Sequence, residues 1–274
     1  MKRIFSIPQY LVSLAFLLIF GFPLVWMFYN TFKTTPELTA NVWALPHRLY
    51  LENYRRVILE SGIPRYYVNS IVVSVISVTG LTLFSAMAGY IFARVRFRGR
   101  EAIFYFFLAG MMIPVHVTLI PVYTMLRSLK MLDTFWALIF PYIGFGLPVS
   151  IFILRGFFSE IPLELEEAAR IDGCSLAGIF WRIMLPLARP AITTVIIFNL
   201  VNTWNEFLFA LTFLNTPDRR TLPLGVREFA DSLGSLNFSM VFTALTLAAV
   251  PILIVYFLAQ RQIIKGLMAG ALKG

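Results

Sequence analysis

Long apolar windows without charges alternate with short polar segments along almost the whole chain. A helix needs about 20 apolar residues to cross a bilayer, because no backbone group that faces lipid can stay without a hydrogen bond. The pattern therefore predicts an all-α integral membrane protein with six transmembrane helices. We place them near residues 10–31, 68–93, 102–125, 134–155, 190–213 and 239–259.

The basic residues predict the direction of these helices. Arginines crowd the short turn after the second predicted helix, at Arg94, Arg96, Arg98 and Arg100. Such clusters stay on the cytoplasmic side of a membrane. Both termini and the loop 156–189 are then cytoplasmic, and the loop 33–66 is external. That external loop also carries five basic residues, which argue against an external position. Its length and its three glutamates weaken this objection.

Composition excludes an ordinary soluble domain. Apolar residues make up 59% of the chain and charged residues 14%, and the mean hydropathy is +0.79. The net charge of +9 lies in clusters beside apolar windows, as membrane topology requires, so it does not indicate nucleic acid. Because no repeats or linkers are visible, we expect residues 1–274 to form a single membrane domain. Cys174 is the only cysteine, so the chain cannot form an internal disulfide.

The loop 156–189 has the pattern of two short helices joined by a sharp turn. Pro162 suits the first turn of a helix that we expect to end at Asp172. Gly173 is a natural left-handed stop, and Ser175 is a good cap for the second helix. We expect Pro186 to end that second helix before the fifth transmembrane segment.

Two interpretations of the first short helix remain open. Ala168 and Ala169 keep one face small, so another protein could approach it closely while Glu167 offers a charge. The alternative is a solvated helix in which Glu166 and Arg170 form a pair at i, i+4, worth a few tenths of a kcal/mol.

The same loop resembles the cytoplasmic loop of ATP-binding cassette (ABC) importer permeases. Every fixed position of that family's pattern is matched, by Glu167, Ala168, Ala169, Gly173, Ile183, Leu185 and Pro186. Further segments resemble the carbohydrate-uptake branch, the maltose-type second permease. They are the segment from Ile113 through Pro121, the segment from Trp204 to Leu211, and the tail from Gly266 to Gly274.

The resemblance implies the permease subunit of an ATP-driven sugar importer, with an importer core at about 66–264. It further implies a second homologous permease, two cytoplasmic ATPase subunits and an extracytoplasmic substrate-binding protein, in a bacterial or archaeal plasma (inner) membrane. In such an assembly the matched loop residues would couple the permease to the ATPase. The chain has no Gly-Lys dipeptide and hence no phosphate-binding loop, so we expect no enzymatic activity and no cofactor in this subunit.

Polar residues gather in the fifth predicted helix, at Asn199, Asn202, Thr203, Trp204, Asn205 and Glu206. Sugar hydroxyls need such donors, acceptors and aromatic faces, so these residues are candidates for the sugar pathway. The alternative is that they hold membrane helices together by hydrogen bonds. Glu206 is the only acid placed inside a predicted helix, where a charge must face a cavity or a partner.

Two other classes of protein compete with this interpretation. A secondary transporter driven by an ion gradient would use an intramembrane acid such as Glu206, but it would typically show inverted repeats, which are not visible. A membrane-embedded enzyme or metal site would need clustered His, Asp or Glu, and His47 and His116 stand apart. We expect a kinked helix around His116, between Pro114 and Pro121.

Overall fold

The computed structural model describes residues 7–233 and 237–271, and every regular element within these ranges is helical. The chain forms two compact units. Unit 1 comprises Met1–Tyr67 with Gly225–Pro251, and unit 2 comprises Val68–Leu224 with Ile252–Gly274. Residues 1–6, 234–236 and 272–274 lie outside the described residues, and with them the last three residues of the tail from Gly266 to Gly274.

Unit 1 folds around a buried lysine that follows its first helix. Its complete helices are α1 (Ile7–Asn30), α2 (Thr35–Ala40) and α3 (Glu52–Leu59). Lys33 donates hydrogen bonds to the carbonyl oxygens of Asn41 at 3.1 Å and Val42 at 3.2 Å. Burial lowers the pKa of Lys33, and the carboxylate of Glu37 offsets part of that effect. These contacts give the predicted external loop a fixed fold.

Of the other described helices, three continue from one unit into the other, and the remaining ones belong to unit 2. The continuing helices are α4 (Ile63–Arg94), α13 (Leu222–Leu233) and α14 (Phe238–Ala271). Unit 2 adds α5 (Arg100–Ala109), η1 (Gly110–Met112), η2 (Val115–Thr118), α6 (Leu119–Ser128), α7 (Trp136–Glu160), α8 (Glu164–Ile171), α9 (Leu176–Ile179), η3 (Phe180–Met184), α10 (Leu185–Leu187), α11 (Arg189–Asn205), α12 (Leu208–Phe213) and η4 (Pro217–Arg219).

Within the described residues, four helices are long and apolar enough to cross a membrane, or up to six if each of two bent helix pairs is one span. The third predicted helix, 102–125, is wrong as a continuous element, because its two halves are bent by 89°. Ile113 and Pro114 are both extended at the bend. Proline lacks an N–H and pushes the preceding residue out of the helical region, which explains the break.

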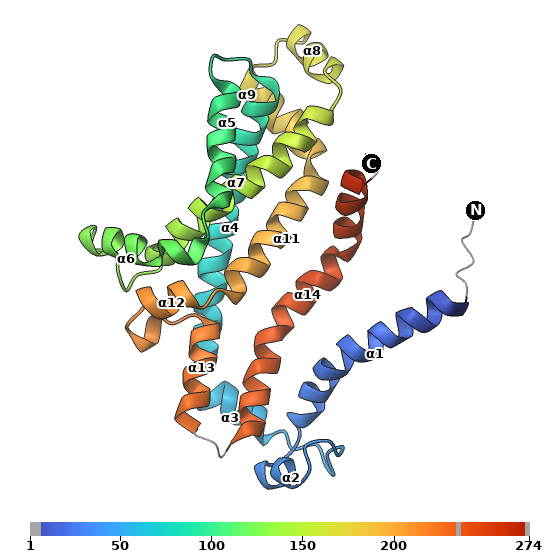
Figure 1. Cartoon of the computed structure of the whole chain (residues 1–274), viewed down its shortest axis with the longest axis vertical. Coiled ribbons are helices and arrows are strands. Elements are labelled where there is room, and N and C mark those ends of the chain that lie inside the picture. Colours follow the sequence, from blue (N-terminus) through green and yellow to red (C-terminus); the bar gives the residue numbers. More distant parts are fainter. Residues whose placement is uncertain (1–6, 234–236, 272–274) are drawn as a thin grey trace. The chain divides into compact units, whose positions relative to one another are not determined.

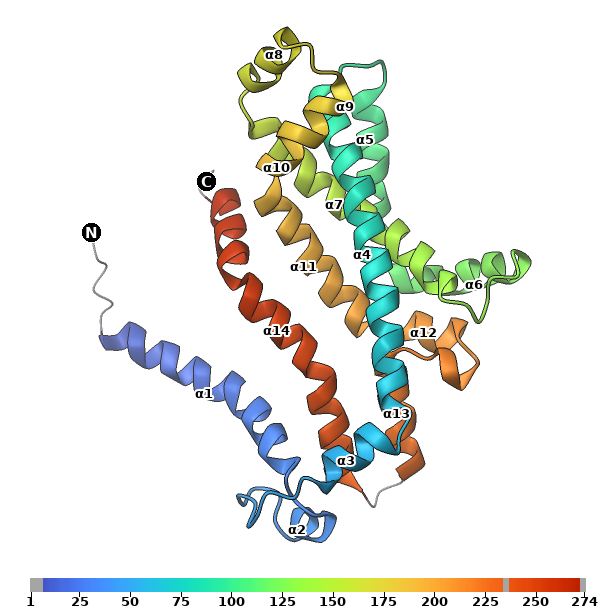
Figure 2. The same cartoon turned by 180° about the vertical axis from the view of Figure 1, so that it is seen from behind.

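The fifth predicted helix, 190–213, is also interrupted. α11 ends at Asn205, Glu206 is extended, and α12 begins at Leu208. A second bend of 75° separates α11 from Leu176–Leu187. Figure 1 shows α8 and α9 at the end of unit 2 where α4 turns into α5, and Figure 2 shows α10 leading into α11 beside them.

α4 and α7 approach closely at Gly89. A Cβ atom at this position would lie 3.0 Å from the Cβ of Leu154 and 3.1 Å from the backbone nitrogen of Arg155. Small residues allow membrane helices to approach in this way. Leu154 belongs to the buried cluster of unit 2 that also contains Tyr90 and Phe158.

Asp133 organises the loop before α7. Its carboxylate accepts hydrogen bonds from the backbone N–H groups of Asn215 and Thr216, both at 2.9 Å, and from the Thr216 hydroxyl at 2.5 Å. Burial raises the pKa of Asp133, but these hydrogen bonds and the charge of Arg219 outweigh it, so the pKa lies below its ordinary value of 3.8. The ionised carboxylate therefore stabilises this loop.

We expect the protection of the Asn215 and Thr216 amides to depend on pH through Asp133. A depressed pKa means that the stabilisation is present above pH 3.8 and is lost as the pH falls through the lower value of the folded protein. Hydrogen exchange of these amides, corrected for the intrinsic rate, measures this. In Asp133→Ala the protection should be absent at every pH, and equal protection in both proteins would contradict the assignment.

We expect Gly89→Ala to destabilise unit 2 by about 1–2 kcal/mol, because the new methyl group presses on the backbone of α7. Gly144→Ala is the matched control, since a Cβ atom there would meet nothing within 4 Å. The control should gain the helix propensity of alanine without the clash. Thermal unfolding of both variants in detergent compares them, and equal stability would show that the helices do not meet at Gly89.

Candidate functional site

The loop between α7 and α11 has the predicted turn and cap. Gly173 has a φ of +80°, and the N–H of Cys174 donates to the Ala169 carbonyl at 2.9 Å. A Cβ atom at Gly173 would meet nothing within 4 Å, so glycine is needed for its backbone conformation alone. Ser175 caps α9, because its Oγ accepts the Gly178 N–H at 3.1 Å.

Two details of the predicted loop are wrong. The first short helix begins at Glu164, so Pro162 precedes it and does not open it. Pro186 does not end the second segment either, since it lies inside α10 and the chain turns at Ala188. Between α9 and α10 the chain forms a π-helical turn, Phe180–Met184, which sequence patterns did not indicate.

α8 has one exposed face and one buried face. Glu164, Glu167, Ala168 and Ile171 are exposed, and their spacing puts them on one side of the helix. Ile171 keeps 86% of its surface exposed, so this face combines an apolar side chain with charged ones. The prediction that Ala169 belongs to this face is wrong: Ala169 is 5% exposed and packs in the core of unit 2.

The second half of the matched pattern anchors the loop. Ile183 and Leu185 are partly buried and pack against the same core as Ala169, and Met184 between them is fully buried. Pro186 is half-buried in α10. The seven matched positions therefore divide into residues that face outward, residues that fix the loop to unit 2, and the glycine of the turn.

Glu166 is a functional candidate that the sequence reasoning missed. Its side chain is buried, and its Oε1 forms an ion pair with Nε of Arg94 at 3.0 Å. Its Oε2 accepts a hydrogen bond from the Tyr90 hydroxyl at 3.2 Å. The predicted pair with Arg170 exists at 3.9 Å and is the longer contact. The i, i+3 spacing of Glu166 and Ala169 was the available signal that both share the buried face.

A cavity of about 920 Å³ lies where this loop meets the turn between α4 and α5. Its wall carries two charged groups from α8, Glu167 and Arg170, beside the buried Glu166. The other charged lining residues are basic, namely Arg94, Arg96 and Arg100. The arginine cluster that predicted the membrane orientation thus borders the exposed edge of α8.

The polar residues of α11 do not share one face. Asn199 is buried, and its amide donates to the Ser150 hydroxyl of α7 at 3.0 Å. Trp204 is buried as well, and the Thr203 hydroxyl donates to the Asn199 carbonyl at 2.9 Å. Asn202 and Asn205 are exposed. Hydrogen bonding between helices accounts for Asn199, whereas exposed asparagines in an apolar helix need a polar surrounding.

Glu206 lies at the break after α11 and not within a continuous helix as predicted. Its carboxylate accepts the backbone N–H groups of Phe209 at 2.7 Å and Ala210 at 3.2 Å. It also accepts the Tyr142 hydroxyl of α7 at 2.6 Å. These contacts cap α12 and join it to α7, which favours a structural role over contact with substrate.

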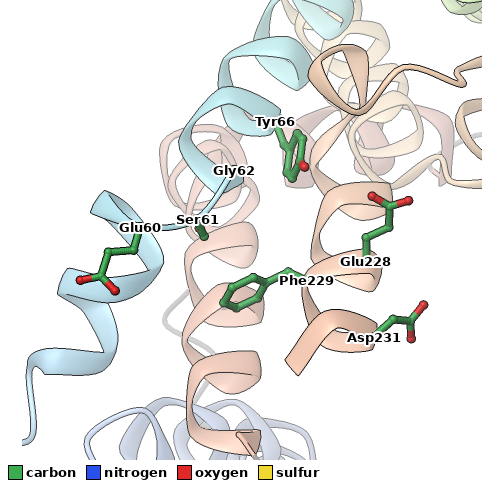
Figure 3. A pocket seen from close by; sticks show the side chains of 7 residues that line it. All are labelled: Glu60, Ser61, Gly62, Tyr66, Glu228, Phe229 and Asp231. Atoms are coloured by element: carbon green, nitrogen blue, oxygen red, sulfur yellow. The ribbon is translucent and has the colours of Figure 1, made fainter. Parts of the chain in front are cut away.

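A second cavity, of about 580 Å³, lies in unit 1. Tyr66 and Phe229 form part of its wall, and Figure 3 shows their rings between carboxylates from α3 and α13. Gly225 lets the Tyr66 ring lie against α13, since a Cβ atom there would approach the ring to 1.9 Å. Asp231 pairs with Arg227 at 3.6 Å. Within 7–233 and 237–271, no group of three or more His, Cys, Asp or Glu is placed to hold a metal ion.

Comparisons with known proteins agree with one another. Residues 82–268 match the family model "Binding-protein-dependent transport system inner membrane component". The chain is 45% identical over 267 residues to a "Putative ABC transporter permease protein ORF2" of Caldicellulosiruptor sp. (strain Rt8B.4), covering 97% of this chain and 96% of that one. It is 34% identical over 252 residues to a "Diacetylchitobiose uptake system permease protein" of Streptomyces coelicolor, covering 92% of this chain and 83% of the relative.

A solved structure shows the same fold. It belongs to a bacterial ABC transporter involved in the import of the acidic polysaccharide alginate, with a TM-score of 0.82 and 25% sequence identity. The similarity covers 95% of this chain and 96% of that chain.

We expect Glu206→Ala to lower stability by about 2 kcal/mol, because α12 loses its cap and the Tyr142 hydroxyl loses a charged acceptor. Thermal unfolding in detergent measures the loss. Glu206→Gln keeps one acceptor oxygen and should retain uptake in proteoliposomes. If Glu206→Ala were as stable as the parent protein and yet lost uptake, a direct contact with the sugar would replace the structural role.

Proposed function

The chain belongs to the family of binding-protein-dependent transport system inner membrane components, as a carbohydrate-uptake ABC importer permease, and from that premise we propose how it works. It forms half of a sugar pathway and couples to a separate ATPase through the loop between α7 and α11. The observation that carries this proposal is the exposed face of α8. Family membership also favours an ATP-driven importer over a transporter driven by an ion gradient.

The exposed face of α8 has the composition of a docking surface. Glu167 supplies a charge, and Ala168 allows a partner to approach closely. Ile171 supplies exposed apolar surface that a partner would remove from water. The left-handed Gly173 and the anchored segment Phe180–Met184 hold this face in a fixed direction. A protein subunit with a complementary groove, the cytoplasmic ATPase, is the partner we propose.

The rest of the assembly follows from the membrane topology predicted by the arginine cluster. The loop carrying α8 faces the cytoplasm of a bacterial or archaeal cell, where ATP is available. The opposite ends of the spans receive a substrate-binding protein, the partner that the family's description implies. Two ATPase subunits need two such loops, which calls for a second homologous permease.

The sugar pathway runs along the exposed side of α11. Asn202 and Asn205 are exposed in this chain, and a polar side chain in a membrane helix faces a water-filled path or a partner. Asn199, Thr203 and Trp204 support that helix from within unit 2. Closing the path on its open side is the role we assign to the second permease.

We expect Ile171→Asp to weaken the association of the ATPase at least tenfold, because the central apolar contact of the docking surface is replaced by a charge. Retention of ATPase subunits on the tagged permease, purified from the complete assembly, measures this. Glu167→Gln should keep ATP hydrolysis but lower the sugar transported per ATP in proteoliposomes.

Asp172→Asn is the matched control, since it also removes an exposed carboxylate of this loop but follows the last residue of α8, Ile171. It should behave as the parent protein in both assays. Full ATPase retention and normal coupling in the Ile171 and Glu167 variants would refute docking through α8. The labelled sugar for uptake is the one that the cognate binding protein binds most tightly.

A further inference from the structure

A buried carboxylate connects the loop to α4 and not only to the helices that it joins covalently. Glu166 is fully buried on α8, and its hydrogen-bond partner Tyr90 and its ion-pair partner Arg94 both belong to α4. Tyr90 and Arg94 lie one turn apart, so they reach the two carboxylate oxygens from one face of α4.

The contacts of Glu166 with Tyr90 and Arg94 fix α8 strongly, because the Glu166 carboxylate is buried away from water. A buried carboxylate without partners loses several kcal/mol of hydration, and the loss of one member of a buried pair leaves an uncompensated charge. The ion pair with Arg94 is not aligned as a hydrogen bond. The Tyr90 hydroxyl therefore supplies a directed contact, while Arg94 supplies the charge.

Arg94 and Tyr90 also bind both sides of the loop. A guanidinium nitrogen of Arg94 donates to the carbonyl of Ile161, the residue at which α7 ends. The Tyr90 ring packs on Phe158 of α7 at 5.8 Å and on Phe180 after α9 at 5.4 Å between ring centroids. The end of α4 thus contacts the entry to α8, α8 itself and the segment that follows it.

The chain segments that connect α8 to its neighbours in sequence are not helical, so they hold it less rigidly than its contacts with α4. The chain leaves the helical conformation at Ile161 before α8, and it turns through Gly173 after it. α11 lies beyond a further bend of 75°. α4 is a continuous helix of 32 residues with no proline beyond its first turn, whereas α7 contains Pro141 and Pro148. α4 is therefore an uninterrupted helix, roughly 48 Å long.

We propose that Glu166 is a positioning residue of the transport cycle that passes displacement of α8 to α4 through Tyr90 and Arg94. This inference rests on the proposed docking of an ATPase on α8. It replaces the simpler picture in which the loop acts only on α7 and α11, the helices it connects. The ATPase acts on the exposed face of α8, and Glu166 on the buried face passes the displacement to α4.

The test uses the complete assembly in proteoliposomes and measures sugar uptake and ATP hydrolysis together. In Glu166→Gln the charge is lost at almost constant volume, and in Tyr90→Phe only the hydroxyl is lost while both ring contacts remain. Each variant should assemble with the ATPase, hydrolyse ATP, and transport about three to ten times less sugar per ATP. Asp172→Asn is the control on the same loop and should keep the parent ratio.

A merely structural role would give a different result, because the amount of assembly would fall and the sugar transported per ATP by the remainder would not change. That outcome would overturn the inference, as would a normal ratio in Tyr90→Phe and Glu166→Gln. The Glu167→Gln variant separates the two proposals. If it uncouples transport while Tyr90→Phe and Glu166→Gln do not, docking on α8 stands and transmission through α4 fails. If no variant changes the ratio and Ile171→Asp retains the ATPase, the docking proposal itself fails.

Discussion

A carboxylate removed from water must be paired, and this constraint at Glu166 determines how the loop between α7 and α11 is held. The ion pair with Arg94 and the hydrogen bond from Tyr90 fix one face of α8 against α4. Because that face is fixed, the direction of the opposite face is fixed as well. The exposed residues Glu167, Ala168 and Ile171 therefore point away from unit 2 as a consequence of the burial of Glu166. The proposed docking surface and the residues that hold it thus belong to one helix of eight residues, Glu164–Ile171.

The same constraint explains the other polar residues within the membrane region. Asn199 is buried because the Ser150 hydroxyl and the Val195 carbonyl accept its amide hydrogens. Glu206 occurs where α11 ends, since the free N–H groups of the next helix give its carboxylate partners. In a medium without water, such side chains stabilise breaks and crossings that backbone hydrogen bonds alone leave unsatisfied. The polar side chains at Asn199 and Glu206 thus have a structural role, which their hydrogen-bond partners explain.

The sequence predicted the existence of the elements better than their continuity. The apolar windows indicated the membrane helices, and Gly173 and Ser175 indicated the turn and cap of the loop, because these are local properties of the chain. The prolines predicted a kink around His116, and the structure has a full break there, at Ile113 and Pro114. The break at Glu206 was not placed, since an apolar window has the same composition whether the helix is straight or bent. Glu166 was missed for a different reason. Its role depends on Arg94 and Tyr90, far away in the sequence, and the neighbouring Arg170 offered a local partner that proved secondary.

The exposed side of α11 shows what a single chain of this kind leaves incomplete. Asn202 and Asn205 are exposed residues in a helix whose other side is well packed, and the Asn205 amide donates one hydrogen bond, to the Val201 carbonyl of its own helix at 2.9 Å. An amide that faces lipid loses the hydrogen bonds that water would supply, so this side of the helix is unstable against hydrocarbon. The second, similar subunit that we propose would enclose a water-filled path here, remove that cost and bring sugar hydroxyls to the amides. The need to shield polar groups therefore acts twice in this protein: inside unit 2 it holds the loop to α4, and along α11 it calls for a partner.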